Sequence, residues 1–227
     1  VVVNMMKYSR ENIKEKFNEL NISCDFTKIS PYGITLSSRL PKSNIEKIKQ
    51  DMFEVQDEGS QLMTLMSKVK SNMQILDYCA GKGTKTLMIN NLTNSTSDIF
   101  AYDKSEKRLE VLKQRVKKLK LNSIKFNISS KKHKSYFDLI ICDVPCSGTG
   151  VWRRRPEEII LFKNKELSKL KQNQYEILTK AAYFCKIGGS LVYITCSILY
   201  DENENQIKKF LKHNQSFICI DLKERVK

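Results

Sequence analysis

Short apolar runs alternate with segments of helical periodicity along most of the chain, beginning near residue 55. The runs have the length and composition of buried strands, and they lie at 74–78, 99–102, 124–128, 138–144, 190–195 and 216–221. Helices are predicted over 105–120, 166–186 and 202–212, and the first of these carries an apolar stripe of Leu109, Leu112, Val116 and Leu119. Strands that alternate with helices predict an α/β fold with a doubly wound, mainly parallel sheet.

The first 45 residues follow a different pattern. Residues 9–20 predict a helix with Ser9 as its N-cap and Ile13, Phe17 and Leu20 on one face. Ile34 and Leu36 alternate with polar residues as in a short strand. We therefore expect a partial small α/β module over 1–45, of the ferredoxin or RRM-like kind that binds RNA, before a larger domain over 46–227. Because the chain starts at Val1 with the pattern of a strand interior, we also expect it to be truncated at its N-terminus.

Composition narrows the class of partner. Forty Lys and Arg residues against 25 Asp and Glu give a formal charge of +15, which favours an anionic partner such as RNA or DNA, although a lysine-rich coding bias would give the same count. Seven cysteines without a CxxC pair, and only two histidines, argue against a zinc site and against a secreted disulfide framework. No apolar run approaches the roughly 20 residues of a membrane span. We expect a cytoplasmic protein without a metal, and nothing in the sequence requires more than a monomer.

A glycine-rich turn follows the first strand of the larger domain. In the segment DYCAGKGTKT, residues 77–86, Gly81 and Gly83 permit positive φ or close approach of a ligand at the start of a helix. The next strand ends at Asp103, where a carboxylate could accept hydrogen bonds from both hydroxyls of a ribose. The spacing does not match a phosphate-binding GxxxxGK[ST] loop. A plain tight turn, and a helix N-terminal charge at Asp103, explain the same residues, and neither feature separates NAD from S-adenosylmethionine.

Two cysteines stand directly after neighbouring predicted strands. The segment Asp143–Gly150 has the sequence DVPCSGTG, and the later segment Thr195–Ser197 has the sequence TCS. The carboxyl ends of parallel strands meet at one edge of a sheet, so the thiols of Cys146 and Cys196 should converge over one pocket. Four cysteines outside these motifs are expected to be buried and to pack as small hydrophobic residues: Cys24, Cys142, Cys185 and Cys219.

Taken together, these segments resemble a known family. DYCAGKGTKT, AYDKS, DLIICDVPCSGTGVWRRRPE and GGSLVYITCSILYDENE are similar to the successive motifs of the NOL1/NOP2/Sun RNA cytosine-5 methyltransferases, and SPYGITLSSRLP and FEVQDEGSQL are similar to the segments that precede them. The resemblance covers nearly the whole chain and is greatest to the bacterial subfamily that acts on small-subunit ribosomal RNA. It implies a Rossmann-like class I S-adenosylmethionine methyltransferase fold, with S-adenosylmethionine as cofactor.

The resemblance also assigns catalytic roles. Cys196 is the expected nucleophile, because carbon 5 of cytosine becomes reactive toward a methyl sulfonium only after a thiolate adds to carbon 6. Cys146 is expected to assist release of the product after the carbon-5 proton is lost, and Asp143 is expected to lie between cofactor and base. The nucleophile must be a thiolate, yet no histidine lies near either motif. Whether Lys85 or backbone dipoles lower its pKa stays open at this point.

The expected cofactor-binding residues also come from the resemblance. They are Cys79, Ala80, Gly81, Lys82, Gly83, Thr84, Lys85, Asp103, Asn127 and Asp143. Two of them depart from the family pattern, since Lys82 replaces a proline and Thr84 replaces a glycine. The acid that the family carries after its third strand has no counterpart, and Asn127 or Ser129 stands in that region. We therefore keep weaker cofactor affinity as an alternative.

Several basic residues are candidates for contact with RNA. Arg153, Arg154 and Arg155 follow the first cysteine motif, and we expect at least one of them to bind phosphate, while Trp152 either stacks on a base or packs internally. The basic face of the helix predicted over 105–120 is expected to be mainly solvated, and it comprises Lys113, Arg115, Lys117, Lys118 and Lys120.

The implied substrate is a cytosine in structured RNA, with 16S ribosomal RNA expected. Three alternatives remain open: the same chemistry on transfer RNA, a non-catalytic RNA-binding or ribosome-assembly factor, and a nicotinamide-dependent oxidoreductase.

Overall fold

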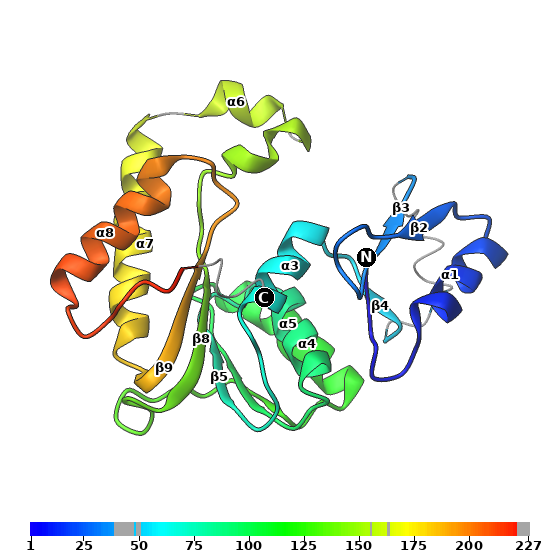
Figure 1. The fold of residues 1–227 in the computed structure, drawn as a ribbon, viewed down its shortest axis with the longest axis horizontal. Coiled ribbons are helices and arrows are strands. Elements are labelled where there is room, and N and C mark those ends of the chain that lie inside the picture. Colours follow the sequence, from blue (N-terminus) through cyan, green and yellow to red (C-terminus); the bar gives the residue numbers. More distant parts are fainter. Residues whose placement is uncertain (39–47, 49–50, 155, 163, 222–227) are drawn as a thin grey trace. The chain divides into compact units, whose positions relative to one another are not determined.

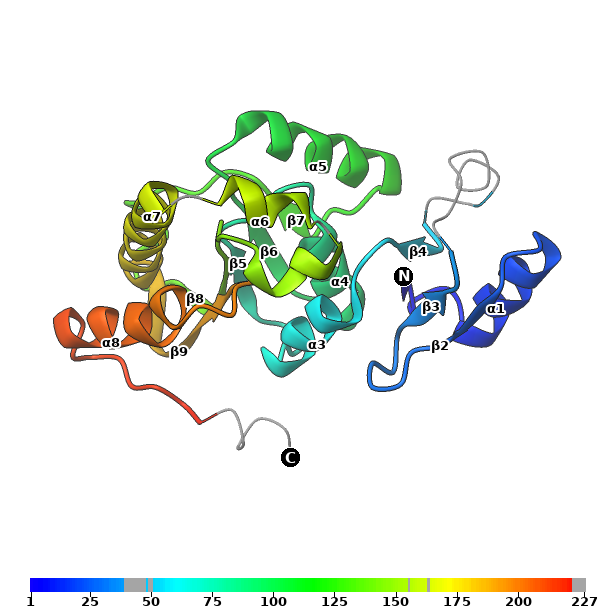
Figure 2. The same ribbon diagram turned by 90° about the horizontal axis from the view of Figure 1, so that it is seen from above.

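The chain divides into two compact units, Val1–Asn127 and Ile128–Lys227. The computed structural model, shown in Figures 1 and 2, describes residues 1–38, 48, 51–154, 156–162 and 164–221. The expected boundary between residues 45 and 46 lies outside the described residues, as do Arg155 and residues 39–41 of the SRLP segment. The assignment of residues 1–45 to an RNA-binding module and of residues 46–227 to a methyltransferase domain therefore stays a prediction.

The N-terminal part of the first unit has its own core. Helix α1 (Arg10–Glu19) begins as expected at Ser9, whose side chain accepts a hydrogen bond from the Asn12 N–H. Two antiparallel pairs stand beside it, in which β1 (Val2–Val3) pairs with β4 (Phe53–Glu54) and β2 (Cys24–Phe26) pairs with β3 (Ile34–Leu36). The buried cluster that holds these elements together consists of Val3, Ile13, Phe17, Ile22, Cys24, Ile34 and Ile48.

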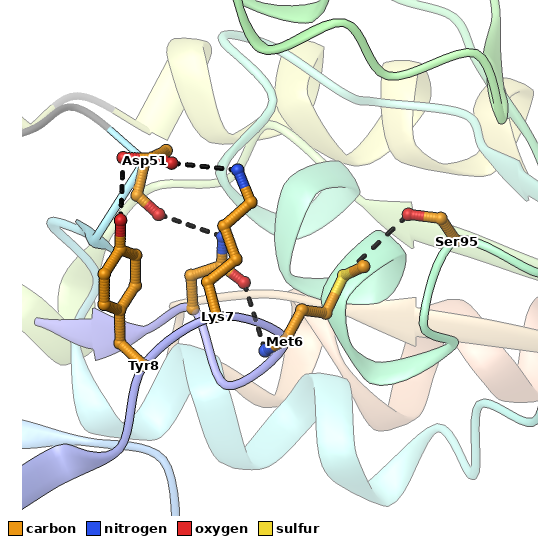
Figure 3. Close-up of polar contacts among 6 residues, drawn as sticks. Met6, Lys7, Tyr8, Asp51 and Ser95 are labelled. Carbon is orange, nitrogen blue, oxygen red and sulfur yellow. Dashed lines mark hydrogen bonds and ion pairs between the residues drawn. The ribbon is translucent and has the colours of Figure 1, made fainter.

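Asp51 joins the start of the chain to the approach to β4. Its carboxylate pairs with Lys7 at 2.9 Å and accepts a hydrogen bond from the Tyr8 hydroxyl, and its backbone carbonyl accepts one from the Asn4 side chain (Figure 3). The same region borders a small pocket of about 50 Å³, which Met6 and Phe53 help to line. One acidic side chain thus fixes the turn that precedes α1.

Helix α3 (Glu58–Met66) links the N-terminal elements to the rest of the first unit. The Glu58 carboxylate accepts hydrogen bonds from the backbone N–H groups of Ile29 and Ser30, and the buried Gln61 side chain donates to the Val1 carbonyl. On the other side, the Lys85 ammonium donates to the Ser60 hydroxyl at 2.8 Å. The segment FEVQDEGSQL therefore connects the N-terminal elements to the glycine-rich turn.

Three parallel strands follow in the first unit. They are β5 (Gln74–Asp77), β6 (Asp98–Ala101) and β7 (Ile124–Lys125), with β6 in the middle, and the helices α4 (Thr84–Leu92) and α5 (Glu106–Leu119) connect them. Ile75, Leu76 and Ile99 are fully buried, as their apolar runs predict. The third strand is shorter than expected, because its pairing with β6 ends at Lys125. Asn127 consequently lies beyond the strand.

The second unit contains a parallel pair of longer strands. Its strands are β8 (Phe137–Asp143) and β9 (Cys185–Ile194), and its helices are α6 (Glu157–Leu161), α7 (Asn164–Ala182) and α8 (Glu204–His213), with 3-10 turns at Thr149–Arg154 and Tyr200–Glu202. Leu139, Ile140 and Ile141 are fully buried. The strand order of the whole sheet is β7-β6-β5-β8-β9. Chain order reverses after β7, so the predicted doubly wound α/β fold is confirmed.

Two local predictions were wrong. The strand expected at 216–221 is absent, since that described segment is irregular, and Cys219 is exposed rather than buried. Phe217 packs against Phe210 of α8, while Ile218 is 84% exposed. Apolar alternation alone does not make a strand without a partner for its backbone hydrogen bonds.

The second wrong prediction concerns the start of β9. The predicted helix ends at Ala182 instead of 186, and β9 begins at Cys185 instead of 190, so that it includes Gly188 and Gly189. Gly188 has a φ of +76°, and the pairing with β8 shifts register there, so the glycines form an irregularity inside the strand.

No helix among the described residues is long and apolar enough to cross a membrane.

Candidate active site

The glycine-rich turn connects β5 to α4 in the first unit. Gly81 and Gly83 have φ values of +56° and +88°, which L residues with a side chain rarely adopt. The first N–H groups of any helix lack an intrahelical acceptor. In α4 the N-cap is Gly83, which has no side chain that could accept a hydrogen bond from them. The turn packs tightly against Leu112 of α5, because a Cβ built on Gly83 would lie 2.1 Å from the Leu112 Cδ1.

Asp103 fixes the other end of this turn. It is only 7% exposed, and its Oδ2 accepts hydrogen bonds from the Gly81 N–H at 2.8 Å and from Arg108 at 2.7 Å. Its Oδ1 accepts from the Ser105 N–H just before α5. The carboxylate therefore serves both as an anchor for the glycine turn and as a charge at a helix N-terminus. The sequence did not reveal Arg108, although its place on the first turn of α5 is within reach of the acid.

The remaining cofactor candidates of the first unit occupy varied environments. Cys79, Thr84 and Lys85 are half-buried near the turn, whereas Lys82 is exposed and its carbonyl accepts a hydrogen bond from Arg115. Asn127 is exposed beyond the end of β7. Next to the turn, the rings of Tyr78 and Tyr102 stack with centroids 4.9 Å apart, a pair that the sequence analysis missed.

The two expected catalytic cysteines lie against each other in the second unit. In the parallel pairing of β8 with β9, Asp143 stands opposite Ile194, so both cysteine motifs leave the sheet at the same edge. The Sγ atoms of Cys146 and Cys196 are 3.2 Å apart, and the Cys196 N–H donates to the Cys146 Sγ at 3.3 Å. The predicted convergence of the thiols is confirmed. Cys196 is exposed and Cys146 half-buried, so Cys196 is the more accessible of the two.

The contact between the two thiols shifts their pKa values in opposite directions. A hydrogen bond from the Cys146 thiol lowers the pKa of Cys196 to about 7, even though burial and the nearby charges of Asp143 and Glu202 act in the opposite direction. The same contact, together with burial, raises the pKa of Cys146. The contact thus favours a thiolate at Cys196 and a protonated thiol at Cys146. The group that lowers the pKa of Cys196 is a second thiol rather than a histidine or a lysine.

A polar network surrounds the cysteines. The Ser147 N–H donates to the Glu202 carboxylate at 2.9 Å, and the Ser147 hydroxyl donates to the same carboxylate and lies 3.2 Å from the Ser197 hydroxyl. On the other side, Thr149 bonds to Ser197 and accepts from the Ile198 N–H. Glu202 was not among the predicted site residues, although it lies only six residues beyond Cys196.

The arginine segment continues from the PCSG motif. Arg153 and Arg154 end the 3-10 turn Thr149–Arg154 and are exposed. Trp152 packs edge-on against Phe162 with ring centroids 5.4 Å apart, which favours internal packing over base stacking. On α5, Arg115 pairs with Glu54 and Lys113 pairs with Glu106, so two residues of the basic face form ion pairs within the first unit.

The thiol pair leads to a pH prediction. We expect iodoacetamide to alkylate wild-type Cys196 at a rate that rises with pH and is half-maximal near pH 7, because the thiolate is the reacting form. In Cys146→Ala the half-maximum should move up toward about 8.5, the ordinary thiol value, since the donor is lost. Peptide mass spectrometry after timed alkylation measures both curves. Equal midpoints in the two proteins would contradict a Cys146 thiol that lowers the pKa of Cys196.

Comparison with known proteins gives a consistent picture. The ribosomal RNA small subunit methyltransferase B of Proteus mirabilis is 33% identical over 222 residues, which is 96% of this chain and 52% of that protein. The probable ribosomal RNA small subunit methyltransferase B of Coxiella burnetii is 31% identical over 217 residues, 92% of this chain and 50% of that protein. The chain thus spans about half the length of these curated relatives.

Solved structures agree with the fold. The crystal structure of PH0851 matches with a TM-score of 0.85 at 25% identity over 93% of this chain and 49% of that one. NSun6 from Pyrococcus horikoshii, solved with SFG, matches with a TM-score of 0.71 at 18% identity over 93% of this chain and 79% of that one. Finally, the family model described as 16S rRNA methyltransferase RsmB/F matches residues 63–225. Since this match covers well over half of the sequence, the chain belongs to the RsmB/F family of 16S rRNA methyltransferases.

Proposed function

We propose that this chain transfers a methyl group from S-adenosylmethionine to carbon 5 of a cytosine in small-subunit ribosomal RNA, through a covalent adduct with Cys196. The observation that carries the proposal is the contact between the Cys146 and Cys196 thiols, 3.2 Å apart at the ends of adjacent strands. A protein that only bound RNA would have no use for a second thiol that lowers the pKa of an accessible first one. Family membership supports the same reaction class.

The residues of the second unit account for the bond changes at the base. The Cys196 thiolate adds to carbon 6 of the cytosine, and the carbon 5–carbon 6 double bond opens to make carbon 5 a nucleophile. After methylation, the carbon-5 proton passes to solvent water and the Cys196 thiolate departs, which restores the double bond. We propose that Cys146, which lies beside the departing sulfur, returns a proton to it, and that Asp143 at the end of β8 holds the base. A cytosine inside folded RNA must leave its stack to reach the thiol.

The glycine-rich turn fits the cofactor. S-adenosylmethionine supplies an electrophilic methyl group on a sulfonium sulfur. The uncapped N-terminus of α4 offers backbone N–H groups, and the buried Asp103 holds a carboxylate at the end of the next strand, as an adenosine ligand requires. We propose that residues 79–85 with Asp103 bind the cofactor, and that the stacked Tyr78 and Tyr102 border its site. A nicotinamide cofactor, suggested by the turn alone, is not consistent with membership of a methyltransferase family.

A substrate comparison tests the proposal. The protein is incubated with S-adenosylmethionine and, in separate reactions, unmethylated 16S ribosomal RNA, 23S ribosomal RNA or transfer RNA, and the RNA is digested to nucleosides for mass spectrometry. We expect 5-methylcytidine to accumulate on the 16S ribosomal RNA. Accumulation on transfer RNA instead would move the substrate to that alternative. Binding of RNA and cofactor without any 5-methylcytidine would support a non-catalytic ribosome-assembly factor.

A further inference from the structure

Glu202 is a buried carboxylate close to the cysteine pair. It ends the 3-10 turn that follows the TCS motif, and it is 0% exposed. A charged side chain is seldom fully buried unless its partners compensate for the lost hydration. Among the residues that the structure describes, no lysine or arginine forms an ion pair with Glu202. Within the described residues, hydrogen bonds provide the compensation.

These hydrogen bonds converge on the segment that carries Cys146. The Glu202 Oε1 accepts from the Ser147 N–H at 2.9 Å and from the Gln174 Nε2 at 2.8 Å, and the Oε2 accepts from the Ser147 hydroxyl. The same Gln174 Nε2 donates to the Pro145 carbonyl at 2.9 Å. Gln174 is itself fully buried on α7. The residues on both sides of Cys146 are therefore held by one carboxylate and one amide.

The segment of Glu202 is equally well fixed. Its backbone carbonyl accepts a hydrogen bond from the Tyr193 hydroxyl at 2.7 Å, and the Asn203 side chain donates to the Ser197 and Leu199 carbonyls. Tyr193 belongs to β9, so the backbone of Glu202 is anchored to the strand that precedes Cys196. Glu202 consequently joins the two cysteine motifs through bonds that the sheet alone does not provide.

The charge of Glu202 argues against a purely electrostatic role. The ionisable groups that act on the Cys196 thiol are Cys146, Asp143 and Glu202, and both carboxylates disfavour a thiolate there. Burial would raise the pKa of Glu202, but the hydrogen bonds from Ser147, Ser197 and Gln174 outweigh burial and hold that pKa below its usual value. The negative charge of Glu202 disfavours the thiolate form of Cys196. We therefore infer that Glu202 contributes to the site through the hydrogen bonds that its carboxylate accepts.

We propose that Glu202 is a positioning residue whose carboxylate clamps the Pro145–Ser147 segment and thereby holds the Cys146 thiol against Cys196. The inference rests on the proposed function, in which Cys196 is the nucleophile. Without the clamp, the Ser147 N–H loses its acceptor, the segment moves, and Cys196 loses the thiol that activates it. A glutamine in the same place would keep the acceptor toward the Ser147 N–H, and the Ser147 and Ser197 hydroxyls could turn to accept from its amide.

Alkylation of Cys196 by iodoacetamide at pH 7 tests the clamp without cofactor or RNA. We expect Glu202→Ala to slow the reaction about fivefold, because a rise of about one unit in the thiol pKa from about 7 lowers the thiolate fraction at pH 7 from about one-half to about one-tenth. Glu202→Gln should react within about twofold of the wild type or faster, since it keeps the hydrogen bonds and removes the opposing charge. The matched control is Glu204→Ala, an exposed glutamate two residues away, which should leave the rate unchanged.

Three outcomes would overturn the proposal. One is a Glu202→Ala protein that folds, as judged by circular dichroism, and still reacts at the wild-type rate. Another is an equal loss in Glu202→Gln, which would make charge rather than hydrogen bonding the cause. If Glu202→Ala does not fold, Ser147→Ala decides, since it removes only the hydroxyl contacts and should slow alkylation severalfold, and a wild-type rate in that variant overturns the clamp. The readout needs no methyl transfer, so it stays interpretable even if the proposed function fails.

Discussion

The Cys146→Ala variant is expected to become trapped on its RNA substrate. With S-adenosylmethionine and unmethylated 16S ribosomal RNA, it should form a protein–RNA species that survives denaturing electrophoresis, because Cys196 adds to the base and then leaves slowly. The Cys146 thiol contacts the departing sulfur at 3.2 Å, and loss of a positioned acid–base group costs about 10²–10⁴-fold in rate. Turnover should fall by a factor in that range while the adduct accumulates.

The control variants make this result specific. The double variant Cys146→Ala/Cys196→Ala should give no adduct and no methylation, because no nucleophile remains. Cys219→Ala, which removes another exposed thiol, should turn over like the wild type and give no accumulation. An adduct that persists in the double variant would mean that another residue attacks the base. Absence of any adduct in the single variant, with cofactor and RNA both bound, would count against the two-cysteine mechanism.

The second large effect is expected at the glycine-rich turn. Gly83→Ala should lower the free energy of unfolding by about 2–5 kcal/mol, since overpacking costs about 1–3 kcal/mol and a left-handed backbone without glycine costs about 1–2 kcal/mol. The added Cβ would lie 2.1 Å from the Leu112 Cδ1, and the backbone φ is +88°. For a chain of this size, that loss corresponds to a fall in Tm of about 4–20 °C. Thermal unfolding monitored by circular dichroism measures it.

Gly188→Ala separates the two contributions. Gly188 has a similar φ of +76°, but a Cβ there meets nothing within 4 Å. We expect this variant to lose only about 1–2 kcal/mol from backbone strain. In addition, Gly83→Ala should fail to bind S-adenosylmethionine by calorimetry, while Gly188→Ala should bind it like the wild type. Equal destabilisation of both variants would show that Leu112 yields without cost and that the turn is not tightly packed.

The sequence was informative where chemistry and periodicity act locally. Each apolar run of the parallel sheet corresponds to an observed strand, because a buried strand needs only a few consecutive apolar residues. The convergence of Cys146 and Cys196 followed from a simple rule, that parallel strands end at a common edge. The failure at 216–221 has the opposite cause, since a strand also needs a hydrogen-bonding partner and the sequence does not state whether one is available.

The features that sequence analysis missed depend on contacts between distant segments. Glu202 is 55 residues from Ser147 and 28 from Gln174, and no local pattern shows that these three side chains meet. The lowered pKa of Cys196 was sought in histidine and lysine, whereas its main cause is another cysteine 50 residues away. Arg108 was passed over because its helix was interpreted as a basic solvated surface, yet its guanidinium contacts the buried Asp103.

The packing of Trp152 has a practical consequence. It is the single tryptophan of the chain, it lies six residues after Cys146, and it packs against Phe162. Among the described residues, its indole N–H is buried without a hydrogen-bond partner. Intrinsic tryptophan emission therefore comes from one known place, the segment that links the PCSG motif to its arginines. The natural protein carries its own fluorophore there, so movement of this segment could be followed in real time without labelling any of its seven cysteines.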